Sequence, residues 1–102
     1  MKKILIVGAG RSATSLIQCL LEACKENAWQ LTVADSDIQL ARAKIQGHSY
    51  AVAETLDVQN EEKRVSLIAQ SDIVISMLPP IFHTLLASTC LKFGKHMLTA
   101  SY

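Results

Sequence analysis

The feature that most constrains the fold of this chain is a regular alternation of short apolar runs with amphipathic stretches along its whole length. The apolar runs predict five β-strands, at residues 3–7, 30–34, 50–53, 72–77 and 96–100. The amphipathic stretches predict helices at about residues 12–25, 38–45, 60–70 and 80–93. Strict alternation with short connections predicts one α/β domain over residues 1–102, with a doubly wound parallel sheet and helices on both faces. Right-handed crossovers favour the strand order 3-2-1-4-5.

The loop after the first predicted strand carries the main functional signal. Residues 8–13 match the pattern G-x-G-x-x-G/A between a strand and a periodic helix, which is typical of Rossmann-like dinucleotide-binding domains. In such a loop Gly8 allows the tight turn, Gly10 lets a pyrophosphate approach the backbone, and Ala13 lets the helix pack close to the sheet. The start of the helix offers N–H groups to the phosphates, and Ser12 could add a hydrogen bond.

The end of the second predicted strand bears on the choice of cofactor. Asp35 lies 25 positions (35 − 10) after Gly10, where a carboxylate can bind the adenosine ribose hydroxyls and would repel a 2′-phosphate. We therefore expect NAD rather than NADP, with Ser36 beside the ribose. Asp35 could instead cap the next helix, a task open equally to Ser36 or Asp37. Arg11, together with alanine at the third place of the loop, is a signal in favour of NADP.

Residues after the third and fourth predicted strands complete the expected cofactor site. The carboxylate of Asp57 and the backbone N–H of Val58 could meet the adenine edge, although Asp57 could equally be a helix cap or a solvated loop acid. Leu78, Pro79 and Pro80 are expected to line the path toward the nicotinamide ribose. Pro80 also suits the first position of a helix, where its missing N–H costs nothing.

No catalytic residue and no metal ligand set can be assigned from the sequence. His83 falls in the first turn of the last predicted helix and is interpreted as a helix-start or interface residue rather than a catalytic one. Cys19, Cys24 and Cys90 all fall in predicted helices without any C-x-x-C spacing, so we expect reduced, packed thiols.

The composition excludes several other classes of function. The net charge is +1 and no basic block is long enough to follow a nucleic-acid backbone, so pairs such as Lys63–Arg64 are expected to be ordinary surface residues. No apolar run approaches the roughly 20 residues of a membrane span. Gly8 and Gly10 interrupt any signal-peptide core, so a cytoplasmic location is expected.

Three further segments resemble the NAD(P)-binding domain of the saccharopine dehydrogenase family. Residues 72–79 (D-I-V-I-S-M-L-P) followed by Phe82-His83, residues 94–102 (G-K-H-M-L-T-A-S-Y) and residues 56–58 (L-D-V) resemble that family's segments in consistent order. The resemblance implies that the chain is an N-terminal part of a longer NAD(P)-dependent oxidoreductase, inactive as a fragment.

The same resemblance implies what the rest of the enzyme does. Family members act on the CH–NH bond of a secondary amine that joins two amino-acid skeletons, and a second α+β domain binds this substrate and often forms a homodimer. The resemblance places Ser101 and Tyr102 near the substrate cleft. Family members that prefer NADP tend to carry a basic or small polar residue where Asp35 stands, which also favours NAD here.

Two alternatives remain open at this point. The glycine loop and the acid after the second strand also occur in nucleotide-sensing regulatory domains that gate potassium transport, although such domains would not explain the segment S-M-L-P-P. A tight strand-to-helix turn that binds no ligand is the other alternative.

Overall fold

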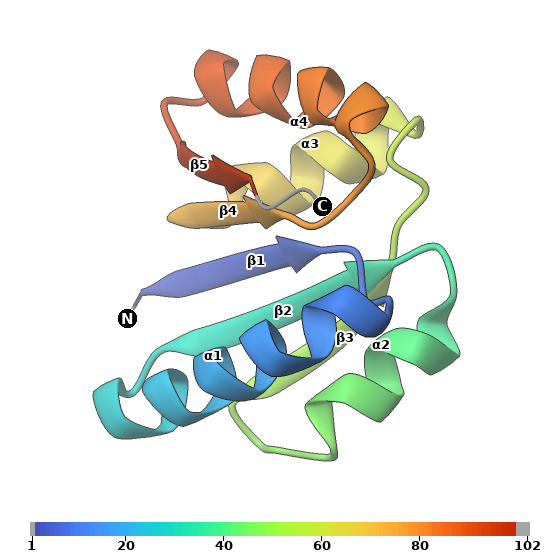
Figure 1. The fold of residues 1–102 in the computed structure, drawn as a ribbon. Helices are drawn as coiled ribbons and strands as arrows, with labels where there is room; N and C mark the ends of the chain where they lie inside the picture. The colour runs from blue at the N-terminus through green and yellow to red at the C-terminus, as the bar shows by residue number, and fades with distance from the viewer. Residues whose placement is uncertain (1, 100–102) are drawn as a thin grey trace.

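The computed structural model describes residues 2–99 and shows a three-layer α/β domain (Figure 1). All five strands are parallel and lie in the order β3-β2-β1-β4-β5. Their bounds are β1 Lys3–Val7, β2 Gln30–Asp35, β3 Ala51–Thr55, β4 Ile73–Ser76 and β5 His96–Thr99. The helices are α1 Thr14–Asn27, α2 Ile38–Ile45, α3 Glu61–Ala69 and α4 Pro80–Lys92. The predicted Rossmann-like fold and strand order are therefore confirmed.

The central strand β1 explains why helices cover both faces of the sheet. Its residues alternate between two cores: Ile4 and Ile6 pack on the side of α1 and α2, whereas Leu5 and Val7 pack on the side of α3 and α4. All four side chains are buried, so β1 reads as a continuous apolar run rather than an alternating one. Figure 1 shows α1 and α2 together below the sheet and α3 and α4 together above it.

The entry into α1 is tighter than the sequence predicts. The helix was expected from residue 12, but a 3₁₀ turn, Arg11–Ala13, comes first, and the α-helix begins at Thr14. The N–H of Ala13 donates to the carbonyl of Gly10 at 3.0 Å, which is the i→i+3 bond of such a turn. This turn sets the direction in which the glycine loop enters the helix.

Arg64 corrects the expectation of an ordinary surface residue. It is only 9% exposed, with Nη1 2.6 Å from the carbonyl oxygen of Val58 and Nε 3.0 Å from Oγ1 of Thr89. The fork of guanidinium donors allows this burial, because it finds acceptors on two elements at once. Arg64 thereby ties α3 to α4 and to the loop that follows β3.

The cysteines are free thiols but not all are packed. Cys24 and Cys90 are buried, and burial raises the pKa of both thiols, so they stay protonated. Cys19 is exposed on α1, which corrects the expectation of packing for that residue. Within residues 2–99, no helix is both long and apolar enough to cross a membrane.

Candidate functional site

The site is built where the chain reverses its direction across the sheet. β1 lies between β2 and β4, and its last residue, Val7, is in register with Ala34 of β2 and Ser76 of β4. The connections from β1 and from β4 leave toward opposite faces, so a crevice opens beyond these carboxyl ends. This is the place where open parallel sheets bind their ligands.

The glycine loop leaves backbone donors free at the mouth of this crevice. The amide of Gly8 continues the sheet ladder to β2 at 2.8 Å, and the amide of Ala9 is also bonded to β2, at 2.7 Å. The next amides, those of Gly10, Arg11 and Ser12, make no hydrogen bond within the described part of the chain. They open the 3₁₀ turn and helix, where N–H groups and the helix dipole favour an anion.

The space in front of these amides is open. Gly10 has φ −73° and ψ −174°, and a Cβ built there would meet nothing within 4 Å. Arg11 and Ser12 are exposed beside it, whereas Ala13 is fully buried against the sheet. The open space and the unbonded amides fit the pyrophosphate of a dinucleotide, because phosphate oxygens can reach the backbone where no side chain intervenes.

Asp35 has a structural task that the sequence did not reveal. Its Oδ2 accepts the hydrogen bond from the amide of Ala9 at 2.7 Å, and its Oδ1 accepts one from the amide of Asp37 at 2.8 Å. The carboxylate thus fastens the glycine loop to the end of β2. Capping of α2 falls to Asp37, whose side chain accepts from the amide of Gln39, and Ser36 is exposed between them. An acid at position 35 is therefore explained without a ribose ligand.

Exchange of Asp35 for asparagine should destabilise the domain by about 2 kcal/mol, since charge-assisted hydrogen bonds are worth about 1.5–3 kcal/mol. Urea unfolding monitored by Trp29 fluorescence measures the effect. Asp37→Asn is the matched control, because asparagine caps helices as well as aspartate does, and it should leave the midpoint nearly unchanged. Equal midpoints for the two variants would show that Asp35 does not fasten the loop.

A groove of about 260 Å³ beside the loop gathers most of the residues predicted from the later strands. It is smaller than the roughly 300–1,000 Å³ of sites that enclose a whole ligand, so it suits one end of a dinucleotide. Its lining comes from the ends of four strands and the first turn of α4: Val7, Asp35, Ser36, Leu56, Asp57, Val58, Gln59, Leu78 and Phe82.

The groove also shows what the sequence did not assign. Leu78 lines this groove together with Phe82, and its expected contact with the nicotinamide ribose stays a prediction. Phe82 follows Pro80 by two positions, so its place on the first helical turn was the available signal. Pro79 and Pro80 are exposed and do not line the groove, and Pro80 takes the first position of α4 as predicted.

Asp57 is exposed, and its Oδ1 accepts a hydrogen bond from the amide of Gln59 at 3.0 Å. The cap of α3 is Asn60 rather than Asp57, which removes one of the alternatives for Asp57. Contact of Asp57 with an adenine edge stays a prediction. Ser101 and Tyr102 lie outside the described residues.

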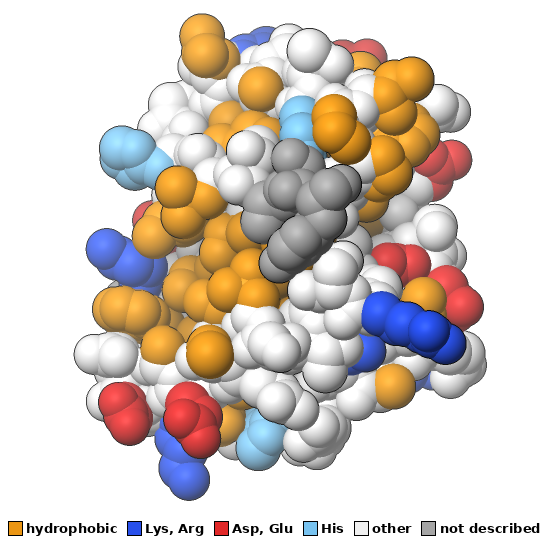
Figure 2. Space-filling view, viewed as in Figure 1, with side chains coloured by type: hydrophobic (Ala, Val, Ile, Leu, Met, Phe, Trp, Pro, Cys, Tyr) orange, Lys and Arg blue, Asp and Glu red, His pale blue; other side chains and the backbone are white. Residues whose placement is uncertain are grey.

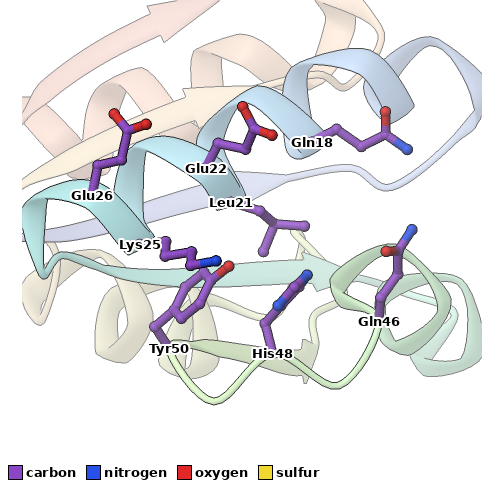
Figure 3. Close-up of a pocket in the computed structure, with 8 residues that line it drawn as sticks. All are labelled: Gln18, Leu21, Glu22, Lys25, Glu26, Gln46, His48 and Tyr50. Carbon is purple, nitrogen blue, oxygen red and sulfur yellow. The ribbon is translucent and has the colours of Figure 1, made fainter.

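A second cavity lies at the other end of the strands. It has a volume of about 590 Å³ and lies between the second half of α1 and the connection from α2 to β3. In Figure 3, Lys25 and Tyr50 point toward each other, while Glu22 and Glu26 point away from them. This cavity is larger than the groove beside the glycine loop, but it is remote from the carboxyl ends of the strands, where ligands of such folds bind. Residues 2–99 contain no cluster of side chains that could hold a metal ion.

Comparison with known proteins shows the family to which the chain is related. The family model described as "Saccharopine dehydrogenase NADP binding domain" matches residues 4–102. Saccharopine dehydrogenase [NADP(+), L-glutamate-forming] of Schizosaccharomyces pombe is 33% identical over 102 residues, covering 100% of this chain and 22% of that protein. Mitochondrial alpha-aminoadipic semialdehyde synthase of Bos taurus is 35% identical over 103 residues, covering 99% of this chain and 11% of that protein.

Solved structures show the same fold. Apo saccharopine dehydrogenase (L-Glu forming) from Saccharomyces cerevisiae superposes with a TM-score of 0.87 at 27% identity, covering 100% of this chain and 22% of that chain. A short-chain dehydrogenase/reductase from Veillonella parvula, solved in complex with NADP, has a TM-score of 0.77 at 16% identity, covering 96% of this chain and 46% of that chain, and supports the fold alone.

These matches correct the expected cofactor. The preference for NAD is wrong, because the matching family model is described as an NADP-binding domain and the S. pombe relative is named for NADP(+). The physical reason is the one given above: the carboxylate of Asp35 binds two backbone amides, so its presence is no evidence for a ribose ligand. Nothing in the matches supports a regulatory domain of potassium transport.

The match to the family model runs through nearly the whole chain, from β1 past the end of β5. The chain nevertheless spans only about a tenth to a fifth of the length of the curated relatives named here (11% and 22%). The fold, the glycine loop and the sequence matches agree: this chain belongs to the saccharopine dehydrogenase NADP-binding domain family.

Proposed function

We propose that this chain is the cofactor-binding domain of a longer enzyme that transfers hydride between NADP(H) and the CH–NH bond of a secondary amine joining two amino-acid skeletons. The observation that carries the proposal is the set of unbonded amides at Gly10, Arg11 and Ser12, facing open space at the start of a helix. A bound nicotinamide ring supplies the hydride chemistry, and the domain binds and orients the dinucleotide.

The groove extends the proposal to the adenosine end of the cofactor. Its walls are mainly apolar, with Leu56, Val58, Leu78 and Phe82 contributing aliphatic and aromatic surface, as a planar base requires. It begins at Asp35, which is bonded to the glycine loop. Pyrophosphate donors and an apolar base site therefore lie side by side, in the order in which a dinucleotide presents its parts.

Arg11 and Ser36 are proposed to bind the 2′-phosphate. Both residues are exposed, Arg11 directly after Gly10 and Ser36 directly after β2. The bond between Ala9 and Asp35 holds these two segments together. Arg11→Ser should therefore weaken NADP binding about tenfold and NAD binding much less, because guanidinium–phosphate bonds are charge-assisted. Calorimetric titration of both cofactors measures this.

The matched control for this prediction is Arg42→Ser, which removes another exposed arginine, from the last turn of α2. It should change neither affinity. An equal loss for NADP and NAD in Arg11→Ser would contradict a role at the 2′-phosphate, and would place Arg11 at the pyrophosphate instead.

The surface of the domain supports the proposal of a second domain. On the α1 side of the sheet, Leu16, Leu20, Ile73 and Met77 are only partly buried, and Leu98 of β5 is 60% exposed. Figure 2 shows hydrophobic side chains gathered on this face, between α1 and β5. A contiguous apolar surface of this kind marks an interface. We propose that residues 1–102 form one domain of the enzyme and that a substrate-binding α+β domain covers this apolar surface. We also propose that the enzyme is a homodimer.

The substrate class rests on the relatives. Their names include saccharopine and L-glutamate, so the proposed substrate is saccharopine or a similar amine of two joined amino-acid skeletons. Ser101 and Tyr102 remain proposed substrate-side residues. A cytoplasmic location also remains a prediction. The Bos taurus relative is named as mitochondrial, which is a different compartment.

The test is an assay of the full-length protein that carries this domain. Given saccharopine and NADP⁺, it should produce reduced cofactor, and the omission of either should abolish the signal. Absence of turnover with saccharopine and related secondary amines, with NADP binding intact, would overturn the substrate class. Absence of both binding and turnover would overturn the whole proposal.

A further inference from the structure

A buried hydrogen-bonded pair lies beside the glycine loop without a place in the function described so far. Oγ of Ser76, the last residue of β4, lies 2.7 Å from Nδ1 of His83, in the first turn of α4. Ser76 is completely buried. The other ring nitrogen of His83, Nε2, is also buried, and it has no hydrogen-bond partner within the described residues.

The surroundings of Ser76 bear on which nitrogen of His83 carries the proton. The Ser76 hydroxyl accepts a hydrogen bond from the amide of Leu78 at 3.4 Å. The direction of its bond to Nδ1 of His83 depends on the tautomer of the ring. When the Ser76 hydroxyl donates to Nδ1, the neutral imidazole carries its proton at Nε2. In that tautomer His83 presents an N–H donor at Nε2.

A buried donor without a partner is rare in folded proteins and costs free energy unless something accepts from it. Ser76 is in register with Val7, and the residue that follows it, Met77, lies against the glycine loop: a Cβ on Gly8 would be 3.2 Å from the Met77 carbonyl carbon. His83 does not line the adenosine groove, although its neighbour Phe82 does. Its ring is held against Ser76, the last residue of β4, at the carboxyl end of the sheet.

We infer that the Nε2–H of His83 donates a hydrogen bond to an oxygen of the nicotinamide mononucleotide half of bound NADP(H), with Ser76 as the positioning residue that fixes the tautomer. This inference rests on the proposed function, and it adds His83 as a residue that binds the nicotinamide half of the cofactor. The first turn of α4 then contacts both halves of the cofactor, with Phe82 on the adenosine side and His83 on the other.

Binding measurements with two probes test the inference in the full-length protein. NADPH contains both halves of the cofactor, whereas adenosine 2′,5′-bisphosphate contains only the adenosine half. His83→Asn, which keeps a polar group near Nδ1 but none near Nε2, should weaken NADPH about tenfold and leave the bisphosphate unchanged. His83→Gln carries an amide N–H close to the place of Nε2 and should retain most of the NADPH affinity.

Each outcome has one meaning. If His83→Asn and His83→Gln bind NADPH as tightly as wild type does, the inference is overturned and the cofactor proposal stands. If wild type binds neither probe, the cofactor proposal itself fails. Equal weakening of both probes in both variants would assign His83 a purely structural role and would also overturn the inference.

The tautomer provides a readout that a merely structural role would not move. Nitrogen NMR of histidine-labelled protein should show His83 with its proton on Nε2, and Ser76→Ala should mix the two tautomers. Addition of NADPH should shift the Nε2 resonance of wild type. A proton on Nδ1 in the wild-type protein, or an Nε2 resonance unmoved by saturating NADPH, would contradict the inference.

Discussion

Replacement of Gly10 by valine is expected to weaken NADPH binding by about a hundredfold, equivalent to about 2.7 kcal/mol, and to leave folding almost unchanged. At φ −73° and ψ −174° the backbone suits a β-branched residue, and a Cβ there meets nothing within 4 Å. The free energy of unfolding should therefore stay within about 0.5 kcal/mol of wild type. The isopropyl group would instead occupy the space through which phosphate oxygens reach the loop amides.

Calorimetry with NADPH and urea unfolding of the same preparations separate the two effects for Gly10→Val. Gly47→Ala is a useful control for binding, because Gly47 follows α2 and is remote from the loop. A Gly10→Val protein that folds normally and still binds NADPH tightly would show that the cofactor does not lie against this loop.

Gly8→Ala, unlike Gly10→Val, should act mainly on folding, and it should lower the free energy of unfolding by about 3 kcal/mol. Gly8 has φ +106°, a conformation that side chains rarely adopt, and its added Cβ would lie 3.2 Å from the Met77 carbonyl carbon. Backbone strain and a close contact with β4 therefore act together. Since that contact is with backbone, a side-chain rotation cannot relieve it.

The control for Gly8→Ala is again Gly47→Ala. Gly47 also has positive φ, +73°, but an added Cβ there meets nothing within 4 Å, so only the strain of about 1–2 kcal/mol applies. The difference between the two unfolding free energies, measured in urea, reports the contact with Met77 together with the greater backbone strain at φ +106°. Equal losses at the two positions would mean that the loop relaxes away from β4.

Much of the fold could be predicted because the apolar residues of the strands and helices recur at the spacing that each kind of element requires. The run from Ile4 to Val7 is apolar at every position, which only a strand covered on both faces requires. Arg64 could not be predicted in the same way. Its burial depends on acceptors at Val58 and Thr89, which are adjacent to it only after α3 and α4 have packed together.

The sequence predicted that the candidate site lies at the strand ends, but it did not predict the task of every residue there. The ends of β2, β3 and β4 were expected to meet, and the groove does bring Asp35, Asp57 and Leu78 together. The role of Asp35 could not be read from its position, since a carboxylate at the end of β2 can bind a ribose or a backbone amide with the same residue type. The pair of Ser76 and His83 was missed because its seven-residue separation spans a strand end, a turn and a helix start.

An amide NMR titration of the labelled domain with NADPH tests most directly whether the cofactor binds at the glycine loop. We predict that the largest shifts fall on the amides of Gly10, Arg11 and Ser12, which have no partner in the described structure, with smaller shifts along the groove. Shifts confined to the distant groove around His48 and Tyr50, or no shifts at saturating cofactor, would contradict it.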